Sequence, residues 1–133
     1  MSSGRGATCK PKIGAKLAAP DRPVVCFTGD AGLEMVLGEL ATARELKTPI
    51  VVVVFVDASL ALIELKQRGE KLKNVGVDFT ETNFAATAEA LGGVGVAVDN
   101  RLDLTDALKT ALARDRFTVI AARIKRKAYD GRL

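Results

Sequence analysis

Two aspartates stand where they could bind one metal ion together. Asp30 lies in the small-residue run Thr28-Gly29-Asp30-Ala31-Gly32, and Asp57 directly follows the apolar run 50–56. The run 50–56 and the β-branched run 23–28 are both typical of buried strands. Ligands of open α/β sheets bind at the carboxyl ends of the strands. If these two strands are neighbours, both carboxylates point into one crevice, and their oxygens suit a hard cation such as Mg²⁺.

The residues around Asp30 favour an anion at the same place. Gly29, Ala31 and Gly32 are small, so a ligand can approach the backbone closely. A helix predicted from about Leu33 would direct its free N–H groups and the positive end of its dipole toward the crevice. A diphosphate that chelates Mg²⁺ would satisfy both the helix and the acids.

A purely structural role for each acid stays open at this point. Asp30 could cap its helix, and Asp57 could begin a turn. Their paired placement at equivalent strand ends favours the metal-binding interpretation.

The composition excludes several other kinds of site. The chain contains no histidine, which excludes histidine acid–base catalysis, catalytic triads and the commonest zinc sites within it. Its two cysteines, Cys9 and Cys26, do not make a disulfide framework. The longest apolar run, 50–56, is shorter than the roughly 20 residues of a membrane helix, and residues 1–11 lack the apolar core of a signal peptide. We therefore expect a cytoplasmic protein with no membrane partner.

The net charge of +4 gives little support to nucleic-acid binding. The basic residues gather near the two ends of the chain, and apart from Tyr129 no aromatic residue lies among them as a stacking platform. We expect no nucleic-acid partner.

The elements that must position the two acids alternate along the chain. Alternating strands and helices predict a three-layer α/β/α fold with a mainly parallel sheet and right-handed crossovers. The pattern also makes Asp103 a candidate N-cap. The predicted strands are 23–28, 49–56, 94–98 and 117–124, the predicted helices are 33–46, 84–91 and 103–113, and residues 59–72 are predicted as a loop that leads into an irregular helix.

The length of 133 residues fits one domain. Residues 1–12 show no periodicity and are predicted to be an irregular leader, residues 13–126 form the predicted domain, and residues 127–133 form a basic tail.

In these segments the sequence resembles the cofactor-binding domain of thiamine-diphosphate-dependent enzymes of the acetolactate synthase and 2-oxoacid decarboxylase group. That family's signature is Gly-Asp-Gly, then a helix and a strand, then a pair of Asn or Asp residues. Gly29-Asp30-Ala31 matches the first part, and Val56-Asp57 matches the second at the family's spacing. The likeness covers residues 13–124 and includes the flanking segments 13–18, 39–43, 62–63, 78–79 and 84–86.

The resemblance implies thiamine diphosphate and Mg²⁺ as cofactors in a truncated form of the family's fold. It implies that Asp30 and Asp57 bind Mg²⁺ by their side chains and that Ser59 binds it by its backbone carbonyl. The cofactor-binding positions that it implies are Gly29, Asp30, Ala31, Gly32, Asp57, Ser59, Leu60 and Leu62. Of these, Ala31 and Gly32 would offer backbone N–H groups to the diphosphate, and the two leucines are equally plausible as plain core.

The sequence departs from the family's pattern in three respects. Ala31 replaces the second glycine of the signature, and Val56 replaces the usual first Asn, which removes a hydrogen-bonding group beside the metal ligand. No segment matches the family's pyrimidine-binding domain, its cofactor-activating glutamate, or the front part of the diphosphate domain. We therefore expect no turnover by this chain alone and consider a separate pyrimidine-binding subunit as a partner.

A non-catalytic oligomerisation module is the alternative function. The predicted helix 33–46 has apolar residues on one side, and Met35 and Leu46 lie off that side. A helix that is apolar on more than one face usually needs a second partner surface. Members of the family pair across this domain, so a homo-oligomer is expected under either function.

Overall fold

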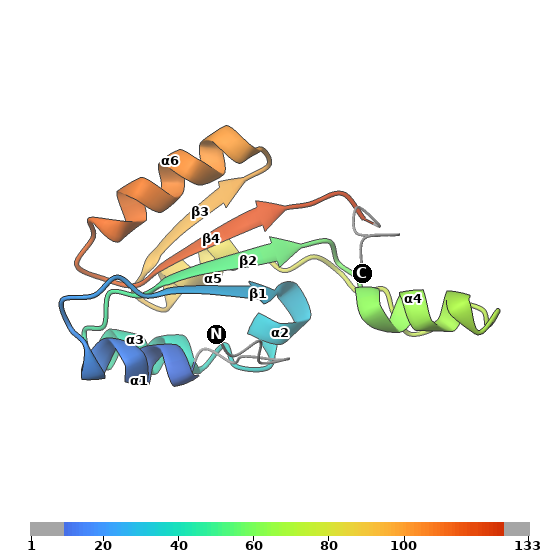
Figure 1. The fold of residues 1–133 in the computed structure, drawn as a ribbon, viewed down its shortest axis with the longest axis horizontal. Coiled ribbons are helices and arrows are strands. Elements are labelled where there is room, and N and C mark those ends of the chain that lie inside the picture. The colour runs from blue at the N-terminus through green and yellow to red at the C-terminus, as the bar shows by residue number, and fades with distance from the viewer. Residues whose placement is uncertain (1–9, 127–133) are drawn as a thin grey trace.

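The computed structural model describes residues 10–126, which form a four-stranded parallel sheet with helices on both faces (Figure 1). The strand order is β1-β2-β4-β3, and all three strand pairs are parallel. The predicted α/β/α class is therefore confirmed. The strands are β1 (Val25–Gly29), β2 (Val51–Val56), β3 (Val94–Val98) and β4 (Thr118–Arg123). The helices are α1 (Lys10–Ala18), α2 (Asp30–Glu34), α3 (Glu39–Glu45), α4 (Ala61–Gly69), α5 (Phe84–Ala90) and α6 (Arg101–Leu112).

The strand β2 is central because its sequence is apolar on both faces. Alternate side chains of a strand point to opposite faces, and the run of valines in β2 is buried on both. Val52 and Val54 belong to one hydrophobic cluster, and Val51 and Val53 belong to the other. This is the pattern of a parallel strand that is covered on both sides.

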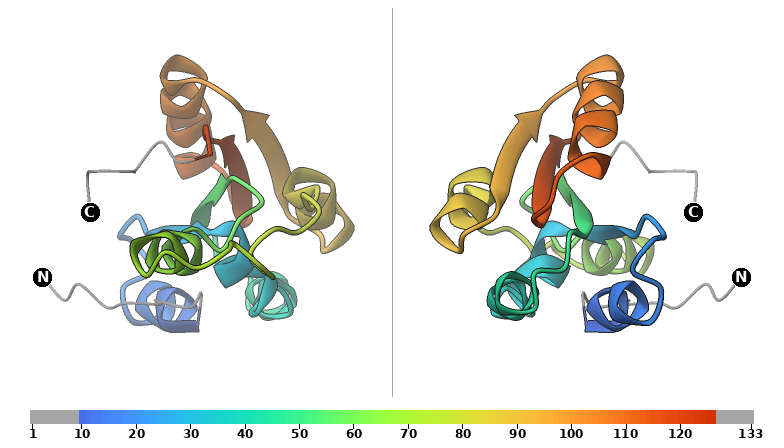
Figure 2. Two further views of the ribbon diagram at one scale, coloured as in Figure 1. Left: turned by 90° about the vertical axis from the view of Figure 1, so that its right-hand side faces the viewer. Right: turned by 90° about the vertical axis from the view of Figure 1, so that its left-hand side faces the viewer.

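Different helices cover the two faces of the sheet (Figure 2). On the first face, α2 lies against β1 and β2 and α5 lies against β3 and β4, and Leu40 of α3 and Phe84 of α5 join the first hydrophobic cluster. On the second face, α6 packs on β2, β3 and β4 through residues such as Leu104 and Leu108. At the β1 end of this second face Phe27 is 58% exposed, so α6 leaves that part of the sheet open.

The predicted helix 33–46 is wrong as a single element. The chain forms α2 from Asp30 and α3 from Glu39, with a turn over residues 35–38 between them. In the turn, hydrogen bonds from residue i to i−3, such as Val36 N–H to the Leu33 carbonyl, replace the longer α-helical bonds. Gly38, a poor helix former, lies at this break.

The predicted irregular leader 1–12 is also partly wrong. Residues 10–12 form the first turn of α1, where a proline such as Pro11 is tolerated because the first N–H groups of a helix have no partner inside it. The helix packs Ile13 into the first hydrophobic cluster. Residues 1–9 and the predicted basic tail 127–133 lie outside the described residues.

Two further predicted elements need smaller corrections. The N-cap of α6 is Asn100, whose side-chain oxygen accepts a hydrogen bond from the N–H of Asp103 at 2.9 Å, so the predicted cap at Asp103 is wrong. Within the predicted segment 59–72, a regular helix α4 forms and projects past the carboxyl ends of the strands (Figure 1). Within residues 10–126, no helix has the length and apolar character needed to cross a membrane.

The close packing of β3 against α5 gives a test of the fold. A Cβ atom at Gly95 would lie 2.0 Å from the carbonyl oxygen of Ala85, so we expect Gly95→Ala to lower the free energy of unfolding by about 2 kcal/mol or more. Gly14→Ala is the matched control, since a Cβ at Gly14 meets nothing within 4 Å and alanine stabilises a helix by about 0.5–1 kcal/mol over glycine. Urea denaturation measures both, and equal effects would contradict the observed packing.

Candidate functional site

The two predicted metal-binding acids lie at the carboxyl ends of neighbouring strands. The strands β1 and β2 pair in register, with Gly29 opposite Phe55. Asp30 follows β1 as the first residue of α2, and Asp57 follows β2. The prediction required these two strands to be neighbours, and they are.

The side chain of Asp30 joins the ends of these two strands. Asp30 is 4% exposed, and its Oδ1 accepts a hydrogen bond from the N–H of Ala31 at 2.8 Å. Its Oδ2 accepts bonds from the N–H groups of Asp57 at 3.1 Å and Ala58 at 2.8 Å. One buried carboxylate therefore satisfies three backbone donors, two of them in the loop after the neighbouring strand.

The loop after β2 adopts a strained conformation to make these bonds. Ala58 has φ 53°, in the left-handed region that costs a non-glycine residue about 1–2 kcal/mol. Consecutive N–H groups in such a turn converge on one anion, and here the anion is the Asp30 carboxylate.

Asp57 and Ser59 lie beside this contact. The half-buried Asp57 accepts a hydrogen bond on its Oδ1 from the N–H of Ser59 at 3.2 Å. Ser59 is 4% exposed, and no described residue donates a hydrogen bond to its backbone carbonyl. Two carboxylates, one on α2 and one in the loop after β2, and a backbone carbonyl of that loop thus belong to residues that line one pocket.

This donor set fits a hard cation. An ionised carboxylate has about four acceptor sites, so the three bonds to Asp30 leave room for a metal contact. Among residues 10–126 no three acidic, cysteine or histidine side chains group as a metal site, so the remaining ligands would be waters or phosphate oxygens. Mg²⁺ usually binds in that way, through one or two carboxylates and substrate phosphates.

All eight predicted site residues line one pocket, whose volume is about 310 Å³. The pocket also includes Phe55, Ala61, Ile63 and Ile124, which sequence reasoning missed. A Cβ at Gly32 would lie 2.8 Å from Thr28 Oγ1, so a larger residue there would need the threonine side chain to move. The predicted helix start at Leu33 is wrong, since α2 begins at Asp30.

One wall of this pocket is apolar because α4 presents its apolar residues outward. Leu62 is 69% exposed and Ile63 is 51% exposed, whereas Glu64, the next residue of the helix, is only 2% exposed. Both exposed residues line the pocket. This reverses the usual arrangement of a surface helix, and the nearly continuous apolar run in 60–65, interrupted only by Glu64, gives no sign of which side faces inward.

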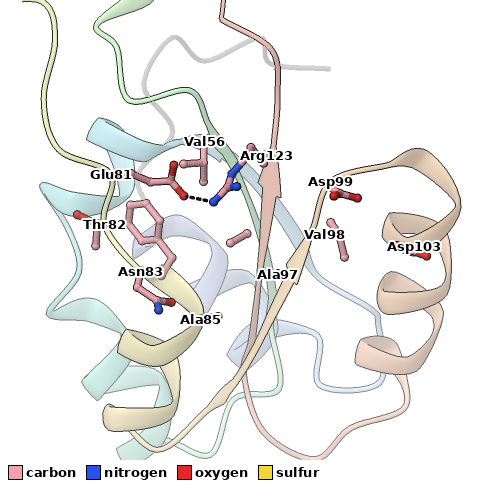
Figure 3. Close-up of a pocket in the computed structure, with 12 residues that line it drawn as sticks. Val56, Glu81, Thr82, Asn83, Ala85, Ala97, Val98, Asp99, Asp103 and Arg123 are labelled. Carbon is pink, nitrogen blue, oxygen red and sulfur yellow. Dashed lines mark hydrogen bonds and ion pairs between the residues drawn. The ribbon is translucent and has the colours of Figure 1, made fainter.

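A second and larger pocket, of about 510 Å³, lies at the carboxyl ends of β2, β4 and β3 (Figure 3). At its rim, Arg123 Nη2 forms an ion pair with Glu81 Oε1 at 2.7 Å, while Asp99 and Asp103 lie across the pocket (Figure 3). Val56 lines this pocket and not the one that contains Asp57. Successive strand residues point to opposite faces, and the expectation that Val56 removes a hydrogen-bonding group beside the metal ligand stays a prediction.

Comparisons with known proteins identify the family. A family model described as "Thiamine pyrophosphate enzyme, C-terminal TPP binding domain" matches residues 4–122. The acetolactate synthase large subunit of Lactococcus lactis subsp. lactis (strain IL1403) is 38% identical over 99 residues, which are 73% of this chain and 17% of that protein. A sulfoacetaldehyde acetyltransferase of Alcaligenes xylosoxydans xylosoxydans is 35% identical over 123 residues, 84% of this chain and 19% of that protein.

A solved structure shows the same fold. The thiamine diphosphate-dependent 4-hydroxybenzoylformate decarboxylase of Rhodococcus jostii RHA1 superposes with a TM-score of 0.84 at 30% identity, over 90% of this chain and 23% of that one. The chain spans about a fifth of the length of the curated relatives that it matches.

Because Asp30 accepts three backbone hydrogen bonds, we expect its removal to lower the free energy of unfolding more than removal of Asp57 does. Asp30→Ala leaves three backbone N–H groups without their acceptor, and we expect it to lower the free energy of unfolding by about 3 kcal/mol. Asp57→Ala removes a half-buried acceptor from Ser59 and should cost about 1 kcal/mol or less. Urea denaturation of both variants measures the difference. Equal losses would contradict the anchoring role of Asp30.

Proposed function

This chain belongs to the family of thiamine pyrophosphate enzyme C-terminal binding domains, and we propose that its pocket at the ends of β1 and β2 binds thiamine diphosphate through Mg²⁺. Asp57, Asp30 and the carbonyl of Ser59 would hold the metal ion, and the metal would hold the diphosphate. The observation that supports this most is the gathering of all eight predicted residues in one pocket.

Polar and apolar residues both line the pocket. The carboxylates of Asp30 and Asp57 and the Ser59 carbonyl would offer oxygen ligands, which suit Mg²⁺ together with phosphate oxygens. Leu60, Leu62 and Ile63 form an apolar wall, which suits an organic ring. When bound, thiamine diphosphate supplies the carbanion chemistry of this class of enzymes, while the residues of this chain bind and orient it.

Turnover is proposed to need a further domain. The described residues supply the metal and diphosphate end of the site, and the resemblance assigns cofactor activation to a glutamate of the pyrimidine-binding domain. We propose that a separate pyrimidine-binding subunit or a larger assembly supplies that group, so the chain by itself binds cofactor without catalysis.

Calorimetry tests the metal-dependent binding. Titration of thiamine diphosphate in the presence of Mg²⁺ should give a heat of binding that EDTA removes, because the metal links two sets of anionic oxygens. Asp57→Ala should weaken the affinity at least about 10-fold, the typical loss of a charge-assisted contact. Asp99→Ala, which changes an acid of the other pocket, is the control and should bind as the wild type does. Binding that persists unchanged in EDTA would contradict the proposal, as would an absence of heat with cofactor and Mg²⁺ together.

Assembly with a second copy of the chain is the second candidate function. In the segment that suggested it, Leu33 and Leu40 are buried in the core, while Met35 is 80% exposed and Leu46 is 48% exposed, as the prediction requires. A further exposed apolar surface lies at Phe27, whose ring stacks on Phe55 with centroids 6.2 Å apart at 13°. Phe55 also lines the pocket beside Leu62, so the surface is continuous with the apolar wall. Exposed apolar patches of this kind mark interaction sites.

Light scattering after size exclusion tests this assembly. We expect the wild type to form a dimer or larger oligomer and Phe27→Glu to shift it toward monomer, because the buried interface would have to accept a charge. Leu102→Glu is the matched control, since Leu102 is 79% exposed on α6, a helix that packs on β2, β3 and β4. A wild type that stays strictly monomeric at all concentrations would rule this function out.

A further inference from the structure

Glu64 is buried on a helix whose apolar residues face outward. It is 2% exposed, while Leu62 and Ile63 on the same helix are exposed by 69% and 51%. Burying a carboxylate is costly unless it is paired and hydrogen-bonded. The Glu64 carboxylate is hydrogen-bonded, and one of its partners is Ser59, in the loop that carries the proposed metal ligands.

The Oε2 of Glu64 accepts a hydrogen bond from Ser59 Oγ at 2.9 Å. The N–H of the same serine donates to Asp57 Oδ1, so Ser59 is held at its side chain and at its backbone nitrogen. Its carbonyl is the only group of Ser59 that the described residues leave without a hydrogen bond. Because hydrogen bonds hold the hydroxyl and the backbone nitrogen of Ser59, they fix the direction in which its carbonyl points.

The segment 77–79 holds the loop on its other side. The N–H of Leu60 donates to the carbonyl of Val77 at 2.7 Å, and the N–H of Phe79 donates to the carbonyl of Ala58 at 3.3 Å. Ser59 forms an isolated antiparallel bridge with Asp78 between these two bonds. The loop thus lies between this segment and Glu64.

Charged and polar groups from three segments balance the carboxylate. Asn74 Nδ2 donates to Oε1 at 3.1 Å, Arg68 Nε lies 3.9 Å from Oε1, and Arg126 Nε lies 3.9 Å from Oε2. Arg126 also pairs with Asp78. The network joins α4, the segment 74–78 and the chain after β4 to the loop at Ser59, and it keeps α4 turned with its apolar residues toward the pocket.

We infer that Glu64 is a positioning residue for the metal end of the site, and that it acts through Ser59. This inference rests on the proposed function. A buried ion pair is weak support for stability, and apolar replacements of similar volume are often neutral or stabilising. A hydrogen bond that fixes a ligand-bearing loop before binding removes an ordering cost from binding. Glu64 therefore contributes to metal and cofactor affinity more than to the stability of the fold.

Two variants of Glu64 separate these contributions. Glu64→Met keeps the volume and removes the acceptor of Ser59 Oγ, and Glu64→Gln keeps an acceptor oxygen and removes the charge. We expect Glu64→Met to melt within a few degrees of the wild type and to bind thiamine diphosphate with Mg²⁺ about 10-fold more weakly. Glu64→Gln should recover most of that loss. In the Glu64→Met background, Ser59→Ala should add no further loss, because the contact it removes is already absent.

Amide hydrogen exchange in the protein without cofactor gives an independent readout. Exchange at Ser59 and Leu60 should be at least about 10-fold faster in Glu64→Met than in the wild type, while core strand amides stay unchanged. If the wild type binds no cofactor, the proposed function fails, and the exchange rates still decide whether Glu64 holds the loop. Unchanged exchange at both residues overturns the inference, and so does a melting temperature that falls in parallel with affinity in both variants.

Discussion

The carboxylate of Asp30 accepts three backbone N–H groups, and two of them belong to the loop after the neighbouring strand. This contact requires β1 and β2 to be adjacent and parallel, so that their carboxyl ends meet at one edge of the sheet. It also requires the left-handed conformation of Ala58, which turns two consecutive N–H groups toward one oxygen. The shape of the candidate site follows from this bond, because the same loop carries Asp57 and Ser59.

The structural and functional explanations of Asp30 are compatible. As an acceptor of backbone bonds, Asp30 fixes the loop, and as an anion with an unused acceptor site, it can also contact a cation. A cation beside it would meet a carboxylate that is already ordered, so little conformational entropy would be lost on binding. A residue that anchors the loop would thereby also prepare the proposed metal site.

The sequence predicted the central strand, the alternation of elements and the residues of one pocket, because each depends on local pattern. Four consecutive valines in β2 are compatible only with burial on both faces, and the two acids follow directly from strand ends. The break between α2 and α3 was not predictable from apolar spacing, because both segments keep that spacing and hydrogen bonds to i−3 close the turn. The orientation of α4 was missed for another reason. Its inward side is set by Glu64 and the distant partners Asn74 and Arg126, which a local pattern cannot reveal.

The outward apolar side of α4 would connect the proposed cofactor binding to the proposed assembly. Leu62 and Ile63 line the pocket, and Phe55 continues this surface to Phe27 at the open end of the sheet. A partner that covers Phe27 and Phe55 would extend toward the pocket and exclude water from its apolar wall. Electrostatic interactions strengthen where water is excluded, so the attraction between the carboxylates and a metal–diphosphate complex would increase. The proposed cofactor binding and the proposed association of the domain would therefore share one continuous surface, and each would favour the other.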